Sequence, residues 1–314
     1  MKIVGFDDAD HRLTWTAVAD AIAEGHRRGA AEIGDLLLQK DGRSLLNRAA
    51  WINGLGIALK SVTVYPDNPG QSPPRPSVQG SVLLFDETTG APSALIDGIL
   101  VTKWKTAGDS VLGARLLARP DPRELLICGA GTVARNLVAA YRELFPAIDR
   151  IRIWNRTPER AEQLAAELAG EGAPVAAAGD LSEAAATADM VSTATMAVEP
   201  FLRGEWLKPG AHVDLIGAYR PDMREADDAL LKRGELFVDS FDTTIGHIGE
   251  IEIPLRAGTI ARDDIRGDLA ELVAGRAGRS GPDAITVFKN GGGAHLDLMV
   301  ADLVRRLVEA PASR

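Results

Sequence analysis

The chain has 314 residues and a formal net charge of −9 at pH 7. A negative field argues against nucleic acid or an anionic membrane surface as a partner, and the length suits two domains better than one. Its one cysteine, Cys128, excludes an internal disulfide, and no stretch of the sequence reaches membrane-spanning length. We therefore expect a cytoplasmic protein, and the spacing of its histidines and acidic residues does not suggest a metal site.

The N-terminal part does not alternate strand and helix in the doubly wound manner. Apolar periodicity predicts a helix at residues 14–28, and Asp41-Gly42 predicts a hairpin turn between two strands. The strands predicted in this part are 35–39, 44–49, 57–65, 77–85 and 92–96, with a proline-rich loop at 66–76. Together they predict a mostly antiparallel sheet, followed by a helix at 98–118.

Lys60 lies within the predicted strand at 57–65, where its neighbours are apolar or carry hydroxyl groups. A lysine in such a strand either reaches past the edge of the sheet to water or is held to meet an anion in a cleft. The residue pattern alone leaves both interpretations open.

A stiff connector with two prolines, residues 119–123, marks a domain boundary. After it, strands and helices alternate regularly, which is typical of a parallel sheet. The predicted strands are 125–128, 151–154, one near 175, 190–194, 212–216, 236–238 and 284–288. Three glycines then precede a helix at 294–308, which we expect to return to the first domain. The predicted domains are therefore 1–118 with 292–314, and 119–291.

A strand, a tight turn and a helix are predicted around Gly129, Gly131 and Ala134. In this GxGxxA pattern the first glycine permits the turn, the second lets a pyrophosphate approach the backbone, and the small third residue allows close packing of helix on strand. The free N–H groups and the positive end of the helix dipole then face the phosphates. Glycines also end strands for purely structural reasons, but the strand that follows at 151–154 favours a dinucleotide site.

The end of that second strand carries Asn155, Arg156 and Thr157 and no carboxylate. An acid there would bind the ribose 2′-hydroxyl of NAD, whereas Arg156 and the hydroxyl of Thr157 are suited to a 2′-phosphate. The pattern favours NADPH over NADH. The alternative is that Arg156 is a solvated charge beside a helix start formed by Thr157 and Pro158.

Several segments together resemble the ornithine cyclodeaminase/μ-crystallin family. They follow one another in the family's order over nearly the whole chain, which is more specific than any single motif. The segments are the Lys60 strand with Tyr65-Pro66-Asp67-Asn68, residues 77–80 and 101–110, the GAGTVA turn, IWNRT, residues 216–225 and 238–240, Gly249-Glu250, and VFKNGGGAHLD at 287–297.

The resemblance implies an α/β fold, with a Rossmann-type doubly wound parallel sheet and a discontinuous α+β domain for substrate binding and dimerisation. It implies a homodimer joined through the N-terminal sheets, with substrate between the domains. It places Lys60 at the carboxylate and reacting nitrogen of a small substrate, with Gly291 also in the substrate site. The implied cofactor-binding residues are Ser77, Lys105, Thr106, Gly129, Gly131, Thr132, Val133, Asn155, Arg156, Thr157, Thr195 and Asn290.

Three departures from the family pattern bear on function. Lys105 stands where the family usually has the arginine of an RTA motif, so the positive charge is kept and the bidentate fork is lost. The usual substrate-clamping arginine has no clear match; Arg48 is the candidate, and a structural surface arginine is the alternative. Tyr219 stands where cyclodeaminating members carry an aspartate, which removes the general base for deamination of ornithine.

We therefore expect an imine-reducing member that uses NADPH, or NADH, to convert Δ1-pyrroline-2-carboxylate or Δ1-piperideine-2-carboxylate to L-proline or L-pipecolate. Lys60 would hold the carboxylate, with Arg48 or Lys105 adding positive charge. Alternatives are an amino-acid dehydrogenase, an N-alkyl amino-acid-forming reductase or an ornithine cyclodeaminase. A non-enzymatic alternative is an NADPH-dependent small-ligand-binding protein of μ-crystallin type.

Overall fold

The computed structural model describes residues 1–310. The chain divides into two compact units, unit 1 with Met1–Lys105 and Gly293–Arg314, and unit 2 with Thr106–Gly292. The division falls within helix α3 (Gly98–Leu117). The predicted domain bounds, which assign that whole helix to the first domain, stay a prediction.

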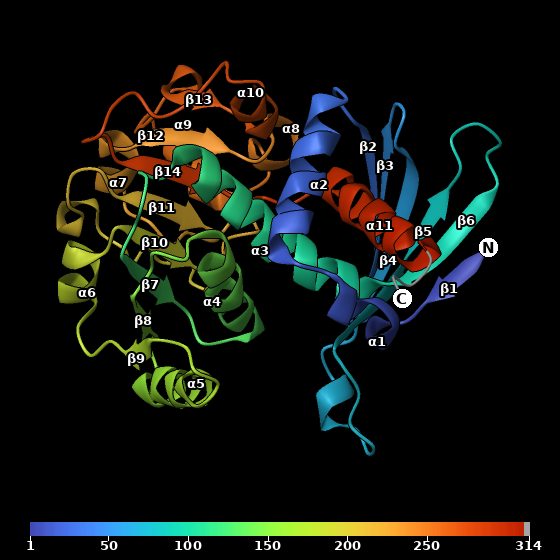
Figure 1. Ribbon diagram of the computed structural model, residues 1–314, viewed down its shortest axis with the longest axis horizontal. Helices are drawn as coiled ribbons and strands as arrows, with labels where there is room; N and C mark the ends of the chain where they lie inside the picture. The colour runs from blue at the N-terminus through green and yellow to red at the C-terminus, as the bar shows by residue number, and fades with distance from the viewer. Residues whose placement is uncertain (311–314) are drawn as a thin grey trace. The chain divides into compact units, whose positions relative to one another are not determined.

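Unit 1 contains a six-stranded sheet (Figure 1). In spatial order its strands are β1 (Lys2–Val4), β6 (Pro92–Asp97), β5 (Val78–Phe85), β4 (Gly56–Val64), β3 (Arg43–Ile52) and β2 (Glu32–Lys40). β1 runs parallel to β6, and the other neighbours are antiparallel. The predicted hairpin turn is confirmed, because Asp41 at φ 51° and Gly42 at φ 73° both have the positive φ that a type I′ turn needs.

Helices α2 (Trp15–Arg27) and α11 (Ala294–Glu309) complete unit 1, together with the short helix α1 (Phe6–Ala9). The Thr14 hydroxyl caps α2 by accepting from the Ala17 N–H at 3.2 Å. α11 packs on β3, β4 and α2, so the last helix returns to the first unit as predicted. It covers the sheet face that carries Ala50, Ala58 and Lys60, all of which are buried.

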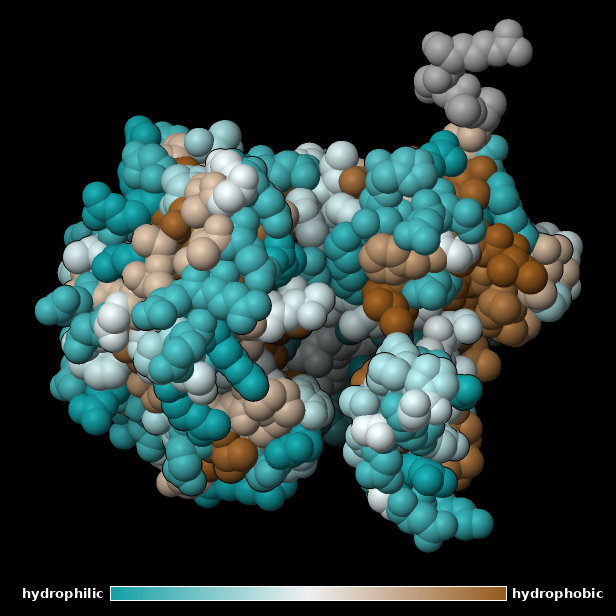
Figure 2. All heavy atoms as spheres, turned by 90° about the horizontal axis from the view of Figure 1, so that it is seen from below, coloured by the Kyte–Doolittle hydropathy of each residue, from teal (hydrophilic) through white to brown (hydrophobic). Residues whose placement is uncertain are grey.

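The opposite face of this sheet carries apolar side chains that remain exposed. The register places Leu36, Leu38, Trp51 and Ile3 on this face, with exposed fractions of 53, 53, 46 and 72%. Hydrophobic side chains also gather on the surface of unit 1 in Figure 2, in the right-hand part of the view. Contiguous exposed apolar surface of this kind is typical of an interaction face.

Unit 2 contains eight parallel strands, which confirms the predicted doubly wound sheet. In spatial order they are β13 (Ile265–Gly267), β12 (Glu235–Val238), β14 (Thr286–Lys289), β11 (His212–Leu215), β10 (Met190–Thr193), β7 (Glu124–Cys128), β8 (Arg150–Trp154) and β9 (Val175–Ala177). The order reverses between β7 and β10. In open α/β sheets, ligands bind at the carboxyl ends of the strands at such a reversal.

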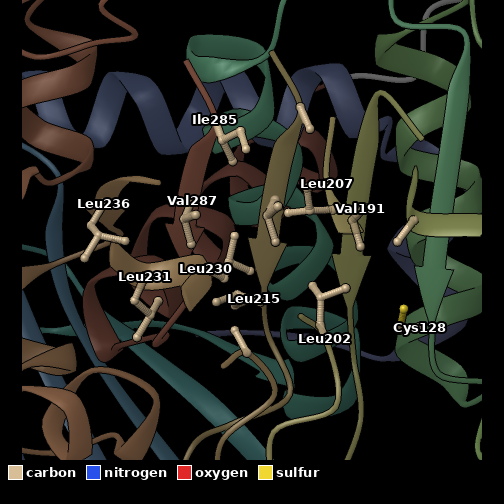
Figure 3. Close-up of a cluster of buried hydrophobic side chains, with 14 of the residues drawn as sticks. Cys128, Val191, Leu202, Leu207, Leu215, Leu230, Leu231, Leu236, Ile285 and Val287 are labelled. Atoms are coloured by element: carbon tan, nitrogen blue, oxygen red, sulfur yellow. The ribbon is translucent and has the colours of Figure 1, made fainter. Parts of the chain in front are cut away.

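Helices connect these strands, and their apolar faces close a core that includes β10, β11, β12 and β14. Figure 3 shows part of this core, with Val191, Leu215, Leu230 and Val287 pointing into one cluster. Cys128 belongs to it and is fully buried. The helices are α4 (Thr132–Leu144), α5 (Pro158–Gly170), α6 (Leu181–Thr187), α7 (Asp228–Arg233), α8 (Phe241–Thr244), α9 (Gly249–Arg256) and α10 (Leu269–Val273). Within residues 1–310, none of the helices combines the length and apolar character that crossing a membrane requires.

Candidate functional site

Lys60 lies in β4, an interior strand of the unit 1 sheet, and is only 7% exposed. Its Nζ donates to Oδ1 of Asp297 at 2.9 Å and to Oγ1 of Thr102 at 2.7 Å. The lysine therefore does not reach past a sheet edge to water, which was the structural alternative. Its charge is held inside the unit by a carboxylate from α11 and a hydroxyl from α3.

Arg48 lies directly opposite Lys60 in the β3–β4 ladder, so the two side chains share one face. Its guanidinium forms an ion pair with Asp35 at 2.9 Å, and the two side chains remain 24% and 41% exposed. An exposed pair of this kind is weak, so it does not prevent Arg48 from exchanging Asp35 for another anion. Its role as a substrate clamp stays a prediction.

His295 adds a buried imidazole to this region of unit 1 and is 4% exposed. Burial lowers the pKa of His295 well below its usual value, with further lowering by His26, Lys105 and Arg48. The His26 ring lies edge-on at 5.6 Å between centroids, and burial lowers the pKa of His26 to about 4. Lys105 and Arg48 thus lie near enough to the first turn of α11 to disfavour a protonated His295.

Other predicted or prominent features of unit 1 are less informative. Ser77 is half-buried just before β5, and its carbonyl accepts from the Tyr65 N–H at 2.7 Å. A hollow of about 250 Å³ is lined by Asp302 and Arg305 among others, and the lining contains none of the predicted site residues. Among residues 1–310, no group of three or more His, Cys, Asp or Glu side chains is placed to hold a metal ion.

The glycine turn of unit 2 joins β7 to α4. Gly129 has φ 127°, and a Cβ there would lie 2.5 Å from the carbonyl oxygen of Ala194. Gly131 is the N-cap of α4, makes no side-chain cap, and has open space where a Cβ would stand. The first N–H groups of a helix have no partner within the helix, so those of Thr132 and Val133 are available to a ligand. This geometry fits a pyrophosphate.

The carboxyl end of β8 carries the predicted ribose-binding residues. The Asn155 amide donates to the Thr157 carbonyl at 2.9 Å, which fixes the local turn. Thr157 is the N-cap of α5, but its hydroxyl makes no capping hydrogen bond. Arg156 is exposed and forms no ion pair with any other residue in 1–310. An uncommitted guanidinium and hydroxyl at this point fit a phosphate.

Thr195 follows β10, and its position is set by a buried carboxylate that the sequence interpretation did not single out. Oε1 of Glu225 accepts from the backbone N–H and the hydroxyl of Thr195, at 2.8 and 2.7 Å. Oε2 accepts from the Thr193 hydroxyl at 2.7 Å and from the Gly217 N–H at 2.6 Å. One side chain therefore ties the ends of β10 and β11 together. Gly217 must lack a Cβ, which would lie 2.1 Å from the Thr195 carbonyl oxygen.

Glu250 fixes the backbone at Glu225 by accepting from the N–H groups of Glu225 and Ala226, at 2.7 and 3.0 Å. Burial raises the pKa of Glu250 to about 7, with a further increase from Glu225. The fully buried Lys289 at the end of β14 opposes this effect with its positive charge and donates to the Leu215 carbonyl at 2.8 Å. Burial in turn lowers the pKa of Lys289.

Asn290 and Gly291 follow β14. The Asn290 amide donates to the Thr106 carbonyl and the Ser110 hydroxyl, both at 3.0 Å, so these predicted residues of unit 2 do meet. The Gly291 N–H donates to Oδ2 of Asp239 at 2.9 Å. A Cβ at Gly291 would lie 2.6 Å from a hydroxyl oxygen, so packing alone requires glycine there.

Asp297 and Glu225 are the functional candidates that sequence reasoning passed over. Both lie inside segments that carry the family resemblance, GGGAHLD and RPDMRE, so the signal was present without an assigned role. Tyr219, directly before the second of these segments, is 56% exposed and occupies the loop after β11. The partners of the two carboxylates lie far away in the chain or across a turn, which spacing does not reveal.

Known proteins agree with this organisation. The model of the ornithine cyclodeaminase/mu-crystallin family matches residues 49–311. A Δ1-pyrroline-2-carboxylate reductase of Paracoccus denitrificans is 49% identical over 308 residues, which are 98% of this chain and 97% of that protein.

Two solved structures are similar throughout. The Δ1-pyrroline-2-carboxylate reductase of Thermococcus litoralis, in complex with NADH and L-proline, has a TM-score of 0.89 and 29% identity and covers 98% of this chain and 97% of its own. An archaeal alanine dehydrogenase dimer with bound NAD has a TM-score of 0.89 and 26% identity and covers 98% and 95%. On these matches over nearly its whole length, the chain belongs to the ornithine cyclodeaminase/mu-crystallin family.

Proposed function

We propose that the chain is an imine reductase that uses a reduced nicotinamide cofactor to convert a small cyclic 2-imino acid to the L-amino acid. The substrate is Δ1-pyrroline-2-carboxylate or Δ1-piperideine-2-carboxylate, and the product is proline or pipecolate. The observation that carries the proposal is the buried ammonium of Lys60 beside Arg48, which offers a small carboxylate a charged partner away from water. The 49% identity to a Δ1-pyrroline-2-carboxylate reductase supports the choice of substrate.

In this proposal Lys60 binds the substrate carboxylate, and Arg48 or Lys105 adds positive charge. Gly291 is assigned to the substrate site from the family resemblance, since packing by itself explains a glycine there. Ordering the substrate away from water is the main contribution of these side chains, since holding the reacting groups in place removes much of the entropic barrier.

The cofactor residues are assigned to the carboxyl ends of β7, β8, β10 and β14. Gly129, Gly131, Thr132 and Val133 hold the pyrophosphate, Asn155, Arg156 and Thr157 the adenosine ribose, and Thr195 and Asn290 line the rest. The family resemblance adds Ser77, Lys105 and Thr106 to the cofactor residues. When bound, the reduced nicotinamide supplies the hydride. NADPH is the preferred form, because β8 ends on an uncommitted arginine and lacks a carboxylate. NADH remains a usable second form.

The test is a substrate panel with both cofactors. The purified protein is mixed with NADPH or NADH and with each cyclic imino acid, and loss of near-ultraviolet absorbance reports turnover. We expect turnover with at least one ring size and a higher kcat/KM with NADPH. Absence of turnover with both ring sizes and both cofactors would remove the proposal.

The similarity to an alanine dehydrogenase favours a second candidate, reductive amination of an open-chain 2-oxo acid. Pyruvate with ammonia or methylamine, in competition with the cyclic imine, separates an amino-acid dehydrogenase or N-alkyl amino-acid-forming reductase from the first proposal. Ornithine cyclodeamination is disfavoured because Tyr219 offers no carboxylate. A ligand-binding protein without activity would bind NADPH and leave every substrate unchanged.

We also propose that two copies associate through the exposed face of the unit 1 sheet. Leu36, Leu38, Trp51 and Ile3 supply the apolar surface that a stable homodimer buries. Light scattering coupled to size-exclusion chromatography should give the mass of a dimer, and Leu36→Glu with Leu38→Glu should give a monomer with unchanged far-ultraviolet circular dichroism. A wild-type monomer at micromolar concentration would contradict the proposal.

A further inference from the structure

The buried ion pair between Lys60 and Asp297 has unused hydrogen-bonding capacity on both sides. Oδ1 of Asp297 accepts from Lys60, whereas Oδ2 is buried and has no hydrogen-bond partner within residues 1–310. Asp297 is 1% exposed, so bulk water does not serve that oxygen. Leaving a buried acceptor unpaired is costly, and such atoms in folded proteins call for an explanation.

Lys60 shows the matching feature. An ammonium has three N–H donors, and in the described chain those of Lys60 meet two partners, Thr102 and Asp297. The Thr102 hydroxyl is itself oriented by donating to the Gly98 carbonyl at 2.7 Å. Within residues 1–310, one donor of the ammonium and one acceptor of the adjacent carboxylate therefore remain without partners, and both groups are buried.

A cation with a spare donor next to an anion with a spare acceptor is complementary to a zwitterion. A protonated cyclic 2-imino acid is such a ligand, because its carboxylate is attached to the carbon of the C=N bond and its nitrogen carries an N–H. Binding head to tail satisfies both buried groups and leaves the four charges balanced, which a lone anion does not do.

We propose that Asp297 is the residue that recognises the substrate's nitrogen, by accepting the N–H of the protonated imine on Oδ2 while Lys60 binds the carboxylate. This inference rests on the proposed imine-reductase function and adds the residue that selects the nitrogen. Asp297 binds the electrophilic form of the substrate. Addition of a hydride to the imine carbon moves the C=N electron pair onto nitrogen and gives a neutral secondary amine, so no proton has to leave Asp297.

The same contact determines specificity. An open-chain 2-oxo acid presents a carbonyl oxygen where the imine presents N–H. That oxygen would face Oδ2 as one acceptor against another, which is repulsive and leaves both unpaired. Asp297 therefore favours imino acids over the corresponding 2-oxo acids, and Asp297→Asn, whose amide can donate, should weaken this discrimination.

Two flat ring acids test the contact directly. Pyrrole-2-carboxylate and furan-2-carboxylate have the same shape, but the first has a ring N–H where the second has an oxygen. Their binding to the wild-type protein with NADP⁺ is measured by isothermal titration calorimetry. We expect the pyrrole acid to bind about tenfold or more tightly than the furan acid, in keeping with a hydrogen bond to a charged acceptor.

Asp297→Asn should reduce this ratio to within about threefold and lower kcat/KM for the cyclic imine by about a hundredfold, with NADPH affinity unchanged. The matched control is Asp302→Asn on the same helix, since both oxygens of Asp302 are already paired, with Arg305 at 2.7 Å and Arg306 at 2.8 Å. The control should keep the wild-type ratio. Melting temperatures check that each variant is folded.

The outcomes separate the two proposals. Equal binding of the two ring acids by the wild-type protein would overturn the role of Asp297, even where imine reduction is observed. A preference for the pyrrole acid that disappears in Asp297→Asn, in a protein that reduces no imine, would support the contact and remove the proposed function. The affinities of the two ring acids for the wild-type protein test the role of Asp297 even if Asp297→Asn does not fold.

Discussion

Unit 1 and unit 2 each bury a carboxylate among predicted site residues, and the two are used in opposite ways. Glu225 of unit 2 accepts four hydrogen bonds from its own chain, two on each oxygen. Asp297 of unit 1 accepts one on Oδ1 and none on Oδ2 within the described residues. Both side chains are within 1% of full burial.

The difference separates a scaffold from a binding group. A fully satisfied buried carboxylate stabilises one arrangement of the backbone, here the loops after β10 and β11, and has nothing left to offer a ligand. A buried carboxylate with one unpaired oxygen destabilises the free protein, and that oxygen gains a hydrogen-bond partner when a ligand binds. We therefore expect changes in unit 1 to affect catalysis and changes around Glu225 to affect cofactor binding and stability.

The largest expected effect is that of Lys60→Met, which keeps the aliphatic stem and removes the charge. It leaves Asp297 buried and unpaired, and we expect kcat/KM for the imine to fall by about a thousandfold, or roughly 4 kcal/mol. Affinity for NADPH, measured by fluorescence titration, should stay within about twofold, because the cofactor residues are assigned mainly to unit 2.

Lys103→Met is the matched control for that change. Lys103 pairs with Asp10 at 2.7 Å in the same unit but belongs to no predicted site. The Lys103→Met protein should keep a kcat/KM for the imine near the wild-type value. Equal losses in the two variants would contradict a specific role for Lys60.

Glu225→Gln tests the scaffold side of the comparison. An amide nitrogen would replace one acceptor and face a donor, so the Thr195 and Gly217 loops should lose their fixed positions. We expect affinity for NADPH to fall about thirtyfold, or roughly 2 kcal/mol, while ring-acid recognition by unit 1 keeps its preference for N–H.

The control for this change is Glu235→Gln at the amino end of β12. Glu235 is also buried, and it pairs with Arg266 and accepts from the Ser280 N–H at 3.1 Å. That variant should lose stability and keep cofactor affinity. A Glu225→Gln protein that is merely less stable, with normal cofactor binding, would argue for a purely structural carboxylate.

Arg156 extends the comparison to an exposed group whose hydrogen-bonding capacity is unused. Arg156→Ala should weaken binding of NADPH about tenfold and leave NADH within about twofold, since only the 2′-phosphate meets the guanidinium. Arg150→Ala at the other end of β8, where Arg150 pairs with Glu124 at 2.6 Å, is the control. Parallel losses for both cofactors would show that Arg156 does not read the phosphate.

The smallest expected effect is a change of stability with pH that has opposite signs in the two units. The pKa of His26 is about 4 in the folded protein against 6.5 in the unfolded chain. The contribution of neutral His26 to stability is therefore present above pH 6.5 and is lost as the pH falls. The pKa of Glu250 is about 7 in the folded protein against 4.5 in the unfolded chain. The contribution of protonated Glu250 to stability is therefore present below pH 4.5 and is lost as the pH rises through 7.

Between pH 7.5 and 5.5 each change amounts to about 1–2 kcal/mol. Hydrogen exchange measured on peptides should therefore show α2 less protected at pH 5.5 and the Glu250 segment more protected, after correction for intrinsic rates. Glu250→Gln should abolish the second trend and leave the first. The same sign in both units would mean that these two groups do not dominate the response.

Local elements were predictable because their causes are local. The hairpin at Asp41-Gly42, the helix that starts after Thr14 and the glycine turn after β7 each follow from residues within a few positions of one another. The order of the parallel strands was not predictable in this way. β14, the last strand of the sheet in the chain, lies between β11 and β12, and this brings Asn290 to Thr106.

The candidate site was predictable only in part for the same reason. Lys60 and the glycine turn carry their own local signals, whereas the carboxylate partner of Lys60 is 237 residues away in the chain. Arg48 was recognised as a candidate, but its pairing with Asp35 depends on the β2–β3 register.

The sequence by itself determined the family, the fold class and the residues with unusual backbone or charge, because glycine conformations, apolar periods and a charge within an apolar strand are properties of short segments. Only the tertiary structure decided which buried carboxylate is saturated and which keeps a free oxygen. Hydrogen-bond saturation depends on groups that folding brings together from distant segments, and no spacing along the chain records it.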